Sequence, residues 1–438
     1  MAYLVKKIGK SLRFLAVLIG ASLALTGVAR AELVIEITRG ATKPVPIAIV
    51  PFRWTGEEAL PADIAAVVRS DLTGSGRFSA LQQSDMLEKP SRGVDIDFDN
   101  WRMVAVDYVL VGELAPAGDE FSIRFELFDV YGGRRVVADQ LLMGRRDLRE
   151  GGHRVADAVF EAITGIKGVF ATRIAYISVA GAPPTQSYRL IVADADGNNE
   201  FVLLESAQPI MSPAWSPDGR QLAYVSFELG RAAVYVQTLR TGTRRVVSDK
   251  PGVNNAPSWS PDGRELALTR SDADGNLDIY VIPVIGSGET RLTTRRSIDT
   301  EPTWSLDGKT IYFTSDRGGA PQVYQVPVSG GDVSRVTFEG RYNARPRIAA
   351  DGRTMAVVHD DRGRFRVAVQ DIENGSLQVL SDGSLDESPS FAPNGAQLIY
   401  ATRRGGRGVL ETVSVDGAIS GRVKSVGNDV REPVWSPY

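Results

Sequence analysis

The sequence predicts an α/β N-terminal domain followed by an all-β six-bladed β-propeller that is closed by the C-terminal strand. Three observations lead to this fold class. A motif related to Pro-x-aromatic-Ser-Pro-Asp-Gly occurs six times, with a weaker match in the fourth and fifth copies, at intervals of about 44 residues; the last copy, Pro-Val-Trp-Ser-Pro, ends one residue before the end of the sequence. A repeat of this length, filled with strand-like segments, is typical of a propeller blade.

Residues 1–31 are predicted to be a cleaved signal peptide. A basic stretch at 6–13 precedes a short apolar run at 14–28, and the sequence Ala-Arg-Ala before Glu32 satisfies the small-residue rule for cleavage after Ala31. The apolar run is shorter than the roughly 20 residues that span a bilayer. We therefore expect export to the periplasm, without direct membrane insertion of the mature chain.

The mature chain is acidic and contains no cysteine. The signal peptide carries five basic residues and no acidic one, so its removal takes the formal net charge from -3 to -8. An acidic protein is poorly suited to the phosphate backbone, and no nucleic-acid partner is expected. The absence of cysteine is compatible with an oxidising compartment, because there is no thiol to be oxidised.

Residues 32–168 contain no repeat and are predicted to form the α/β domain. Alternating and continuous apolar patterns predict its strands, and apolar residues at helical spacing predict its helices. The expected strands lie at 33–37, 47–52, 77–81, 106–114 and in a hairpin over 121–142, and the expected helices at 61–72 and 148–163.

Residues 169–438 are predicted to form the propeller. The large apolar residue of the motif recurs at Trp215, Trp259, Trp304, Ile348, Phe391 and Trp435. The chain enters this region at a second strand near Arg173 and leaves it after a first strand at 433–437. The C-terminal strand must therefore complete the blade that 173–204 begins, which removes free sheet edges.

The repeated motif is interpreted as a folding device. In its Ser-Pro-Asp-Gly part, proline presets the first corner of a turn and glycine suits the fourth position. The aromatic side chain is expected to pack between neighbouring blades. Catalytic roles for the Ser and the Asp are disfavoured because both recur from blade to blade.

No catalytic, metal or cofactor site is predicted. The stretches 194–198 and 272–276 have a calcium-loop appearance, but their glycine is misplaced for an EF-hand, and hairpin turns are expected instead. His153 and His359 are isolated and expected at the surface. Neither a nucleophile elbow nor a zinc-protease or phosphate-loop motif is present.

The unrepeated positions lie just before each motif proline, in six loops that should surround one mouth of the central channel. Acidic residues are common there, including Asp299, Glu301, Asp386, Glu387, Asp429 and Glu432, with Arg341 and Arg345 among them. A solvated rim explains any one of these residues. Six convergent loops, however, are a common place for a propeller to bind a partner.

Several segments together resemble the TolB family, the periplasmic propeller proteins of the Tol-Pal envelope system. They are 39–52, 159–168 with its Thr-Gly-Ile-Lys-Gly junction, 172–176, 211–219 and the terminal Trp-Ser-Pro-Tyr at 435–438. The resemblance covers the whole mature chain.

The resemblance implies a non-enzymatic, monomeric adaptor that links the peptidoglycan-associated lipoprotein Pal at the outer membrane to TolA at the inner membrane. Envelope integrity and outer-membrane invagination in cell division would depend on it. The implied Pal contacts are Val253, Asn254, Asn255, Ala256, Thr300 and Glu301, where Val253 replaces the family's common His. The implied TolA contacts are Glu32, Leu33, Val34, Ile35, Glu36, Ile37, Thr38, Arg39 and Gly40.

A second class of function remains open: a propeller enzyme or carbohydrate-binding protein acting on envelope glycans. Clustered carboxylates in the channel and a deep apolar pocket would favour it. A flat, loop-lined mouth would favour the adaptor.

Overall fold

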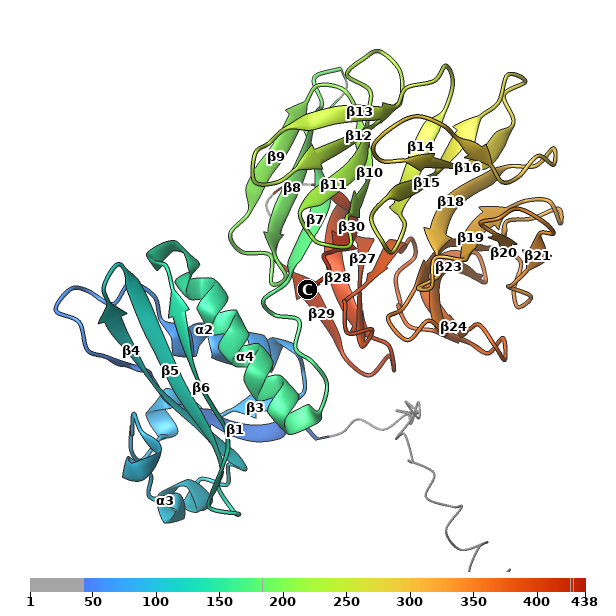
Figure 1. Ribbon diagram of the computed structural model, residues 1–438. Helices are drawn as coiled ribbons and strands as arrows, with labels where there is room; N and C mark the ends of the chain where they lie inside the picture. The colour runs from blue at the N-terminus through green and yellow to red at the C-terminus, as the bar shows by residue number, and fades with distance from the viewer. Residues whose placement is uncertain (1–42, 183, 426, 428) are drawn as a thin grey trace, which may run out of the picture. The chain divides into compact units, whose positions relative to one another are not determined.

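The computed structural model of the chain describes residues 43–182, 184–425, 427 and 429–438 (Figure 1). The predicted signal peptide, the strand expected at 33–37 and the implied TolA contacts, residues 32–40, lie outside these residues.

A six-stranded mixed sheet forms the centre of the α/β domain. Its strand order is β3-β1-β4-β5-β6, with β2 paired to β4. Strand β1 runs parallel to β3 and β4, whereas β4, β5 and β6 are antiparallel. The strands are β1 (Val45–Ile49), β2 (Arg53–Trp54), β3 (Phe78–Ala80), β4 (Tyr108–Ala117), β5 (Glu120–Asp129) and β6 (Arg134–Met143).

Both faces of this sheet are buried because successive side chains of a strand point to opposite sides. Ile47 and Ile49 of β1 belong to a core cluster formed with two helices, while Ala48 belongs to a second cluster that includes Trp101. The helices are α2 (Ile64–Gly74), α3 (Phe98–Met103) and α4 (Leu148–Thr164). The buried, near-continuous apolar pattern of β1 follows from this arrangement.

Capping residues set the ends of the long helices. Helix α2 starts later than the predicted residue 61 because the carboxylate of Asp63 accepts a hydrogen bond from the Ala66 amide at 2.9 Å and caps the first turn. Helix α4 ends at Gly165, which has a φ of 72° and forms the left-handed cap that glycine favours. Its observed bounds agree closely with the predicted 148–163.

Six four-stranded antiparallel sheets make up the propeller, which confirms the predicted blade count. Five are continuous in sequence: β10–β13 (Ile210–Trp215, Gln221–Ser226, Ala233–Thr238, Arg244–Ser248), β14–β17 (Asn254–Trp259, Glu265–Ser271, Leu277–Pro283, Thr290–Arg291), β18–β21 (Asp299–Trp304, Thr310–Ser315, Gln322–Pro327, Ser334–Arg335), β22–β25 (Asn343–Ile348, Thr354–Asp361, Arg364–Asp371, Leu377–Val379) and β26–β29 (Glu387–Phe391, Gln397–Arg404, Arg407–Ser414, Ser420–Val423).

The sixth blade is built from both ends of the propeller sequence. Its order is β30 (Asp429–Trp435), β7 (Arg173–Ala180), β8 (Ser187–Asp194) and β9 (Phe201–Ser206). Strand β30 lies beside β7 (Figure 1), and the two strands pair antiparallel with Trp435 opposite Ile174. The predicted closure by the C-terminal strand is therefore confirmed.

The Ser-Pro-Asp-Gly segments form the predicted tight turns. In the first copy the Gly219 amide donates to the Ser216 carbonyl at 2.9 Å, and Gly219 has a φ of 66°. The Ser216 hydroxyl donates to Asp218 at 2.6 Å and accepts from the Gln221 amide at 2.9 Å. Each turn thus satisfies its own polar groups.

The motif tryptophans join consecutive blades, as the sequence predicts. The indole nitrogen of Trp259 donates to the Ala214 carbonyl, and that of Trp304 to the Ser258 carbonyl, each at 3.0 Å. At the closing blade, Trp435 donates to the Thr172 hydroxyl at 2.8 Å. Each indole therefore buries its ring; those of Trp259 and Trp304 also fix the neighbouring inner strand, and that of Trp435 fixes the segment before β7.

In the part of the chain that the structure describes, no helix combines the length and the apolar character needed to cross a bilayer.

Candidate functional site at the propeller mouth

Six residues in equivalent positions, each just before a motif proline, adopt a left-handed backbone. We call them the pre-proline ring: Ser212 (φ 53°), Ala256 (49°), Glu301 (56°), Arg345 (55°), Ser388 (54°) and Glu432 (51°). A residue before proline normally prefers an extended backbone, and the left-handed region costs a non-glycine residue about 1 kcal/mol or more. This cost is incurred once in every blade.

A β-bulge accompanies each of these residues. In the first complete blade the pairing of β10 with β11 shifts between Met211 and Ala214, and the other five inner strands shift at the equivalent place. Bulges of this kind redirect side chains and are common next to binding sites. Here they occur where the inner strands border the channel.

The pre-proline ring borders a central cavity of about 430 Å³ to which all six blades contribute. A second ring lies two residues further along each inner strand, and because alternate residues of a strand share one face it lines the same cavity. Its members are Ala214, Ser258, Thr303, Arg347, Ser390 and Val434. The channel is therefore lined by two layers of non-repeated side chains.

Hydrogen bonds connect the inner strands of three consecutive blades on one side of the channel, through Ser212 of the pre-proline ring. The Ser212 amide of β10 donates to the Glu432 carboxylate of β30, and the Ser212 hydroxyl donates to Asn255 of β14 at 3.1 Å. Each side chain thus holds the next blade at the channel wall.

The other three blades are connected through Arg345. Its guanidinium donates from Nε to Glu301 at 2.6 Å, its backbone amide donates to the same carboxylate at 3.1 Å, and its Nη1 donates to the Ser388 hydroxyl. This links β18, β22 and β26. Between β14 and β18 the contact runs through Thr269, whose hydroxyl accepts from the Glu301 amide at 3.2 Å and donates to Thr300 at 3.1 Å.

Burial shifts the ionisation of the channel charges. It raises the pKa of Glu432, although Arg345 and the Ser212 amide oppose the rise. It lowers the pKa of Arg347 to about 10, with Glu301 opposing the fall. For Arg345, burial also disfavours the charge, but Glu301 and Glu432 outweigh it and the pKa is raised.

The implied Pal contacts come together at this mouth, with one exception. Asn255, Ala256, Thr300 and Glu301 line the cavity, and Val253 is exposed on the loop before β14. Asn254 is fully buried: its amide donates to the carbonyls of Ala232 and Lys250, and its Oδ1 accepts from Ser248 at 2.7 Å. The Asn254 side chain therefore shapes the loop from within.

Two acidic residues of the loops are structural, so the solvated-rim interpretation is wrong for them. Asp299 and Asp386 are fully buried. Asp299 accepts from Ser315 at 2.6 Å and pairs with Arg317 at 2.7 Å, and Asp386 accepts from the Thr402 hydroxyl. They occupy the same repeat position as Asn254, two residues before the pre-proline ring.

The expected surface placement of both histidines is also wrong. His153 and His359 are 1% and 7% exposed. His153 contacts Asp71 at 2.6 Å and His359 contacts Asn343 at 2.9 Å. Burial disfavours the charged imidazole of His153, but hydrogen bonds with Asp194 and Asp71 outweigh it and raise its pKa to about 9.

Within the described residues, one group has the spacing of metal ligands: Asp71, His153 and Asp196. Asp196 also accepts a hydrogen bond from the Asn198 side chain at 2.8 Å and pairs with Arg149. Arg149 and His153 both also contact Asp194, so these two basic side chains lie among three carboxylates. The two stretches with calcium-loop appearance are hairpin turns, with Gly197 and Gly275 at φ 82° and 84°.

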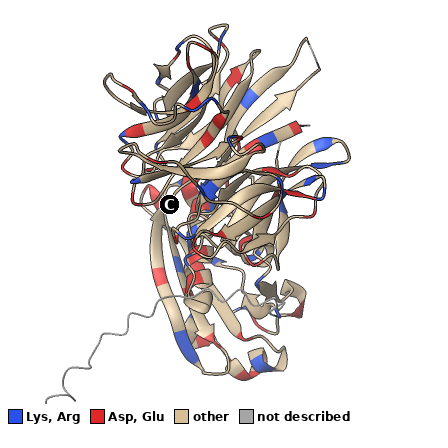
Figure 2. Cartoon of the chain, turned by 90° about the vertical axis from the view of Figure 1, so that its right-hand side faces the viewer, with Lys and Arg blue, Asp and Glu red and all other residues tan. Residues whose placement is uncertain are grey.

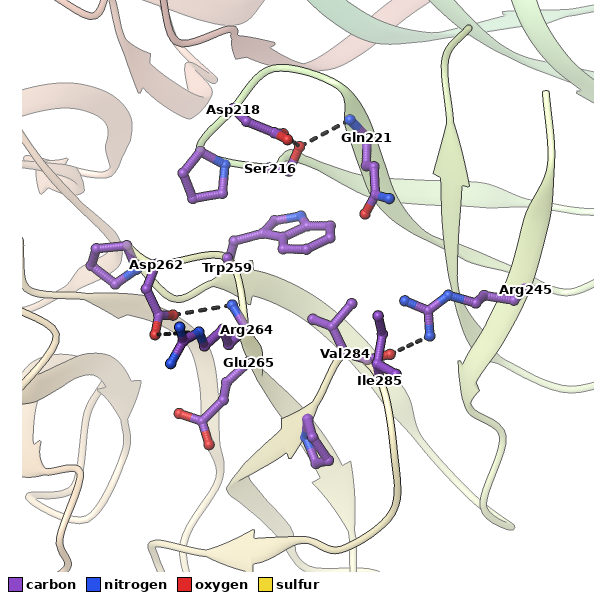
Figure 3. A pocket seen from close by; sticks show the side chains of 14 residues that line it. Ser216, Asp218, Gln221, Arg245, Trp259, Asp262, Arg264, Glu265, Val284 and Ile285 are labelled. Carbon is purple, nitrogen blue, oxygen red and sulfur yellow. Dashed lines mark hydrogen bonds and ion pairs between the residues drawn. The ribbon is translucent and has the colours of Figure 1, made fainter. Parts of the chain in front are cut away.

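A second cavity, of about 1000 Å³, lies at the opposite end of the inner strands (Figure 3). Trp259 stands in its middle, between turns that contain Asp218 and Asp262. Hydrogen bonds from the Ser260 hydroxyl and the Arg264 amide lower the pKa of Asp262. The turns thus favour the ionised form of these two turn carboxylates.

Comparisons with known proteins cover both domains. The TolB amino-terminal domain model matches residues 33–136, and the TolB beta propeller domain model matches residues 160–438. The Tol-Pal system protein TolB of Xanthomonas oryzae pv. oryzae is 46% identical over 98% of this chain and 99% of its own, and that of Thioalkalivibrio sulfidiphilus is 48% identical over 94% and 95%. The crystal structure of TolB from Acinetobacter baumannii is 40% identical, with a TM-score of 0.84, over 91% of this chain and 98% of that one.

The chain belongs to the TolB family.

Membership makes the chain an envelope-associated component of a Tol-Pal system and a non-enzymatic propeller protein, which confirms the prediction that it is not an enzyme. The resemblance read from the motifs is likewise confirmed.

Sequence reasoning missed Arg347 and the left-handed backbone. The position between proline and the aromatic residue reads Ala, Ser, Thr, Arg, Ser and Val in the six motifs, so one charged residue among neutral ones was visible in the sequence. The backbone conformation has no such signal, because proline by itself favours an extended residue before it. Figure 2 shows that basic and acidic residues are otherwise interspersed over the blades.

Proposed function

We propose that this TolB family member is a periplasmic adaptor that links Pal at the outer membrane to TolA at the inner membrane. In this role it supports envelope integrity and draws the outer membrane inward during cell division. The mature chain acts as a soluble monomer, with one partner at each of two separate places.

The observation that carries the proposal is the preformed mouth. The pre-proline ring holds six strained residues around one cavity, and four of the six implied Pal contacts line it. Strain of this kind is retained where function uses it. A rigid mouth pays little ordering cost on binding, and six loops can supply the roughly 1,200–2,000 Å² of a standard interface.

The Pal contacts lie where β14 and β18 meet. Asn255 and Ala256 come from one strand and Thr300 and Glu301 from the other, and Thr269 connects the two. A partner at this place touches two blades at once, while Val253 offers an exposed apolar side chain at the edge.

For TolA, the proposal places binding on residues 32–40, outside the described part of the chain. The segment contains the apolar run Leu-Val-Ile-Glu-Ile, which suits pairing as an added strand. Deleting 32–40 should abolish capture of the periplasmic domain of TolA and leave capture of Pal intact. Equal capture of TolA would contradict this assignment.

We also propose the division of the chain into a signal peptide at 1–31, an α/β domain at 32–168 and a propeller at 169–438. Mass spectrometry of the protein purified from the periplasm should give an N-terminus at Glu32. A retained leader would contradict both the cleavage site and the location.

The Pal assignment is tested by capture of Pal on the immobilised mature chain. The double variant Thr300→Arg/Glu301→Arg should lose Pal, because it adds bulk and reverses a charge at the mouth. Lys309→Glu is the matched control: it lies beyond the turn end of the same inner strand, with a side chain 82% exposed, and should capture Pal normally. Equal recovery of Pal by the double variant would rule out this mouth as the site.

A further inference from the structure

Arg347 is unusual among the residues that line the channel. It belongs to the second ring, where the five equivalent positions hold Ala214, Ser258, Thr303, Ser390 and Val434. A single charged side chain therefore stands among five small or neutral ones at the same depth. Nothing in the turn or strand chemistry of the repeat requires a charge there.

The other channel charges have partners, whereas Arg347 pairs with no carboxylate of the described residues. Arg345 forms an ion pair with Glu301 at 2.6 Å, and the Glu432 carboxylate accepts a hydrogen bond from the Ser212 amide. Nη1 of Arg347 donates a hydrogen bond to the carbonyl of the neighbouring Pro346 at 2.8 Å. Most of the donors on its guanidinium remain available to the cavity.

Arg347 is half-buried at the channel wall, so an unpaired guanidinium there carries a desolvation cost. Burial moves the pKa of Arg347 to about 10, so the group is still charged at neutral pH. A planar fork of donors best matches a carboxylate, which accepts two parallel hydrogen bonds. The cavity of about 430 Å³ is many times the ~30 Å³ share of one water, so it can admit side chains from a partner's loop.

We propose that Arg347 receives the carboxylate of an acidic side chain that Pal inserts into the channel. The inference rests on the proposed function of the mouth and adds the chemistry of recognition: the partner presents an Asp or Glu to this one residue of the second ring. Arg347 then distinguishes an acidic loop from a neutral or basic one of the same shape.

The test measures the Kd of Pal without its lipid anchor for the mature chain by calorimetry. Truncating one partner of a buried charge pair is expected to weaken binding at least tenfold, so Arg347→Gln should raise the Kd by ~30-fold or more, and Arg347→Lys by less. Arg264→Gln, at the turn end of the inner strands with a side chain 85% exposed, is the control and should stay within about twofold of the unchanged chain.

Two further measurements separate recognition from folding. The unfolding midpoint of Arg347→Gln should be equal to or above that of the unchanged chain, since the variant removes a half-buried charge that pairs with no carboxylate of the described residues. Single Asp→Asn and Glu→Gln changes in Pal should include one that weakens binding to the unchanged chain but not to Arg347→Gln.

The outcomes distinguish the two proposals. If the unchanged chain binds Pal and Arg347→Gln binds it equally well, or if no acidic residue of Pal couples to Arg347, the carboxylate inference is wrong and the Pal site stands. If the unchanged chain does not bind Pal at all, both the proposed function and the inference about Arg347 are wrong.

Discussion

The two ends of the inner strands use repetition in opposite ways. At the turn end, both side chains and backbone repeat. In three blades the serine hydroxyl donates a hydrogen bond to the Asp two residues later and accepts one from the backbone amide five residues later; these serines are Ser216, Ser260 and Ser305. At the mouth only the backbone repeats, with the same left-handed φ carried by Ser, Ala, Glu and Arg. Each inner strand thus has one end whose residues are constrained by the fold and, within six residues, another end whose side chains can vary between blades and serve binding.

The first prediction concerns the turn end and is the largest in energy. Trp435→Ala should lower the free energy of unfolding of the propeller by about 3–5 kcal/mol, because the indole is 8% exposed and bonds Thr172. Chemical denaturation followed by circular dichroism measures it, and Trp435→Phe should recover much of the loss. A cost below about 1 kcal/mol would show that the closing strand is not needed for stability.

The second prediction separates two adjacent residues of the mouth. Asp299→Ala should cost about 3–5 kcal/mol of stability, since it leaves the 8%-exposed side chain of Arg317 without its carboxylate. Thr300→Ala, at the next residue, should change stability by less than about 1 kcal/mol. Thermal and urea unfolding of both variants test this, and equal costs would remove the distinction between structural and binding residues there.

The third prediction tests the strained backbone with two alanines of similar sequence setting. Ala256→Gly should stabilise the chain by up to about 1 kcal/mol, because glycine adopts the φ of 49° without strain. Ala214→Gly, in an ordinary strand conformation, should destabilise it by a similar amount. Urea midpoints compare the two, and the same sign of change for both would contradict a local strain at the pre-proline ring.

The fourth prediction is the smallest and uses carboxyl titrations observed by nuclear magnetic resonance. Glu432 should titrate above its ordinary pKa of 4.5, whereas Asp262 should titrate below its ordinary 3.8. Since the folded state then binds the Glu432 proton more tightly, its contribution to stability is present below pH 4.5 and is lost as the pH rises through the folded pKa. Glu432→Gln should remove that slope.

For Asp262 the sign is reversed. Its lowered folded pKa contributes stability above pH 3.8 that is lost as the pH falls through the folded value. If the pKa values of Glu432 and Asp262 were shifted in the same direction, the proposed electrostatic difference between the mouth and the turn end would be wrong.

The blade count, the strand phase and the closing strand could be predicted because each depends on local turn chemistry that repeats in the sequence. The mouth could be located for the same reason, since the loops before the prolines follow from the phase. The burial of Asn254 and Asp299 could not, because a loop sequence does not show which of its polar side chains turn inward. The left-handed ring arises from bulged pairing between strands, which no single segment encodes.

The bond between the Arg173 amide and the Ser436 hydroxyl also has a consequence for the order in which the propeller folds. The two residues are 263 positions apart. If the protein folds from its N-terminus onward, β7 forms before β30, the strand that pairs with its inner edge. Contacts between residues so distant in sequence form slowly. Until then β7 presents an open edge that invites aggregation. Chaperone protection should therefore matter most just before the final strand docks.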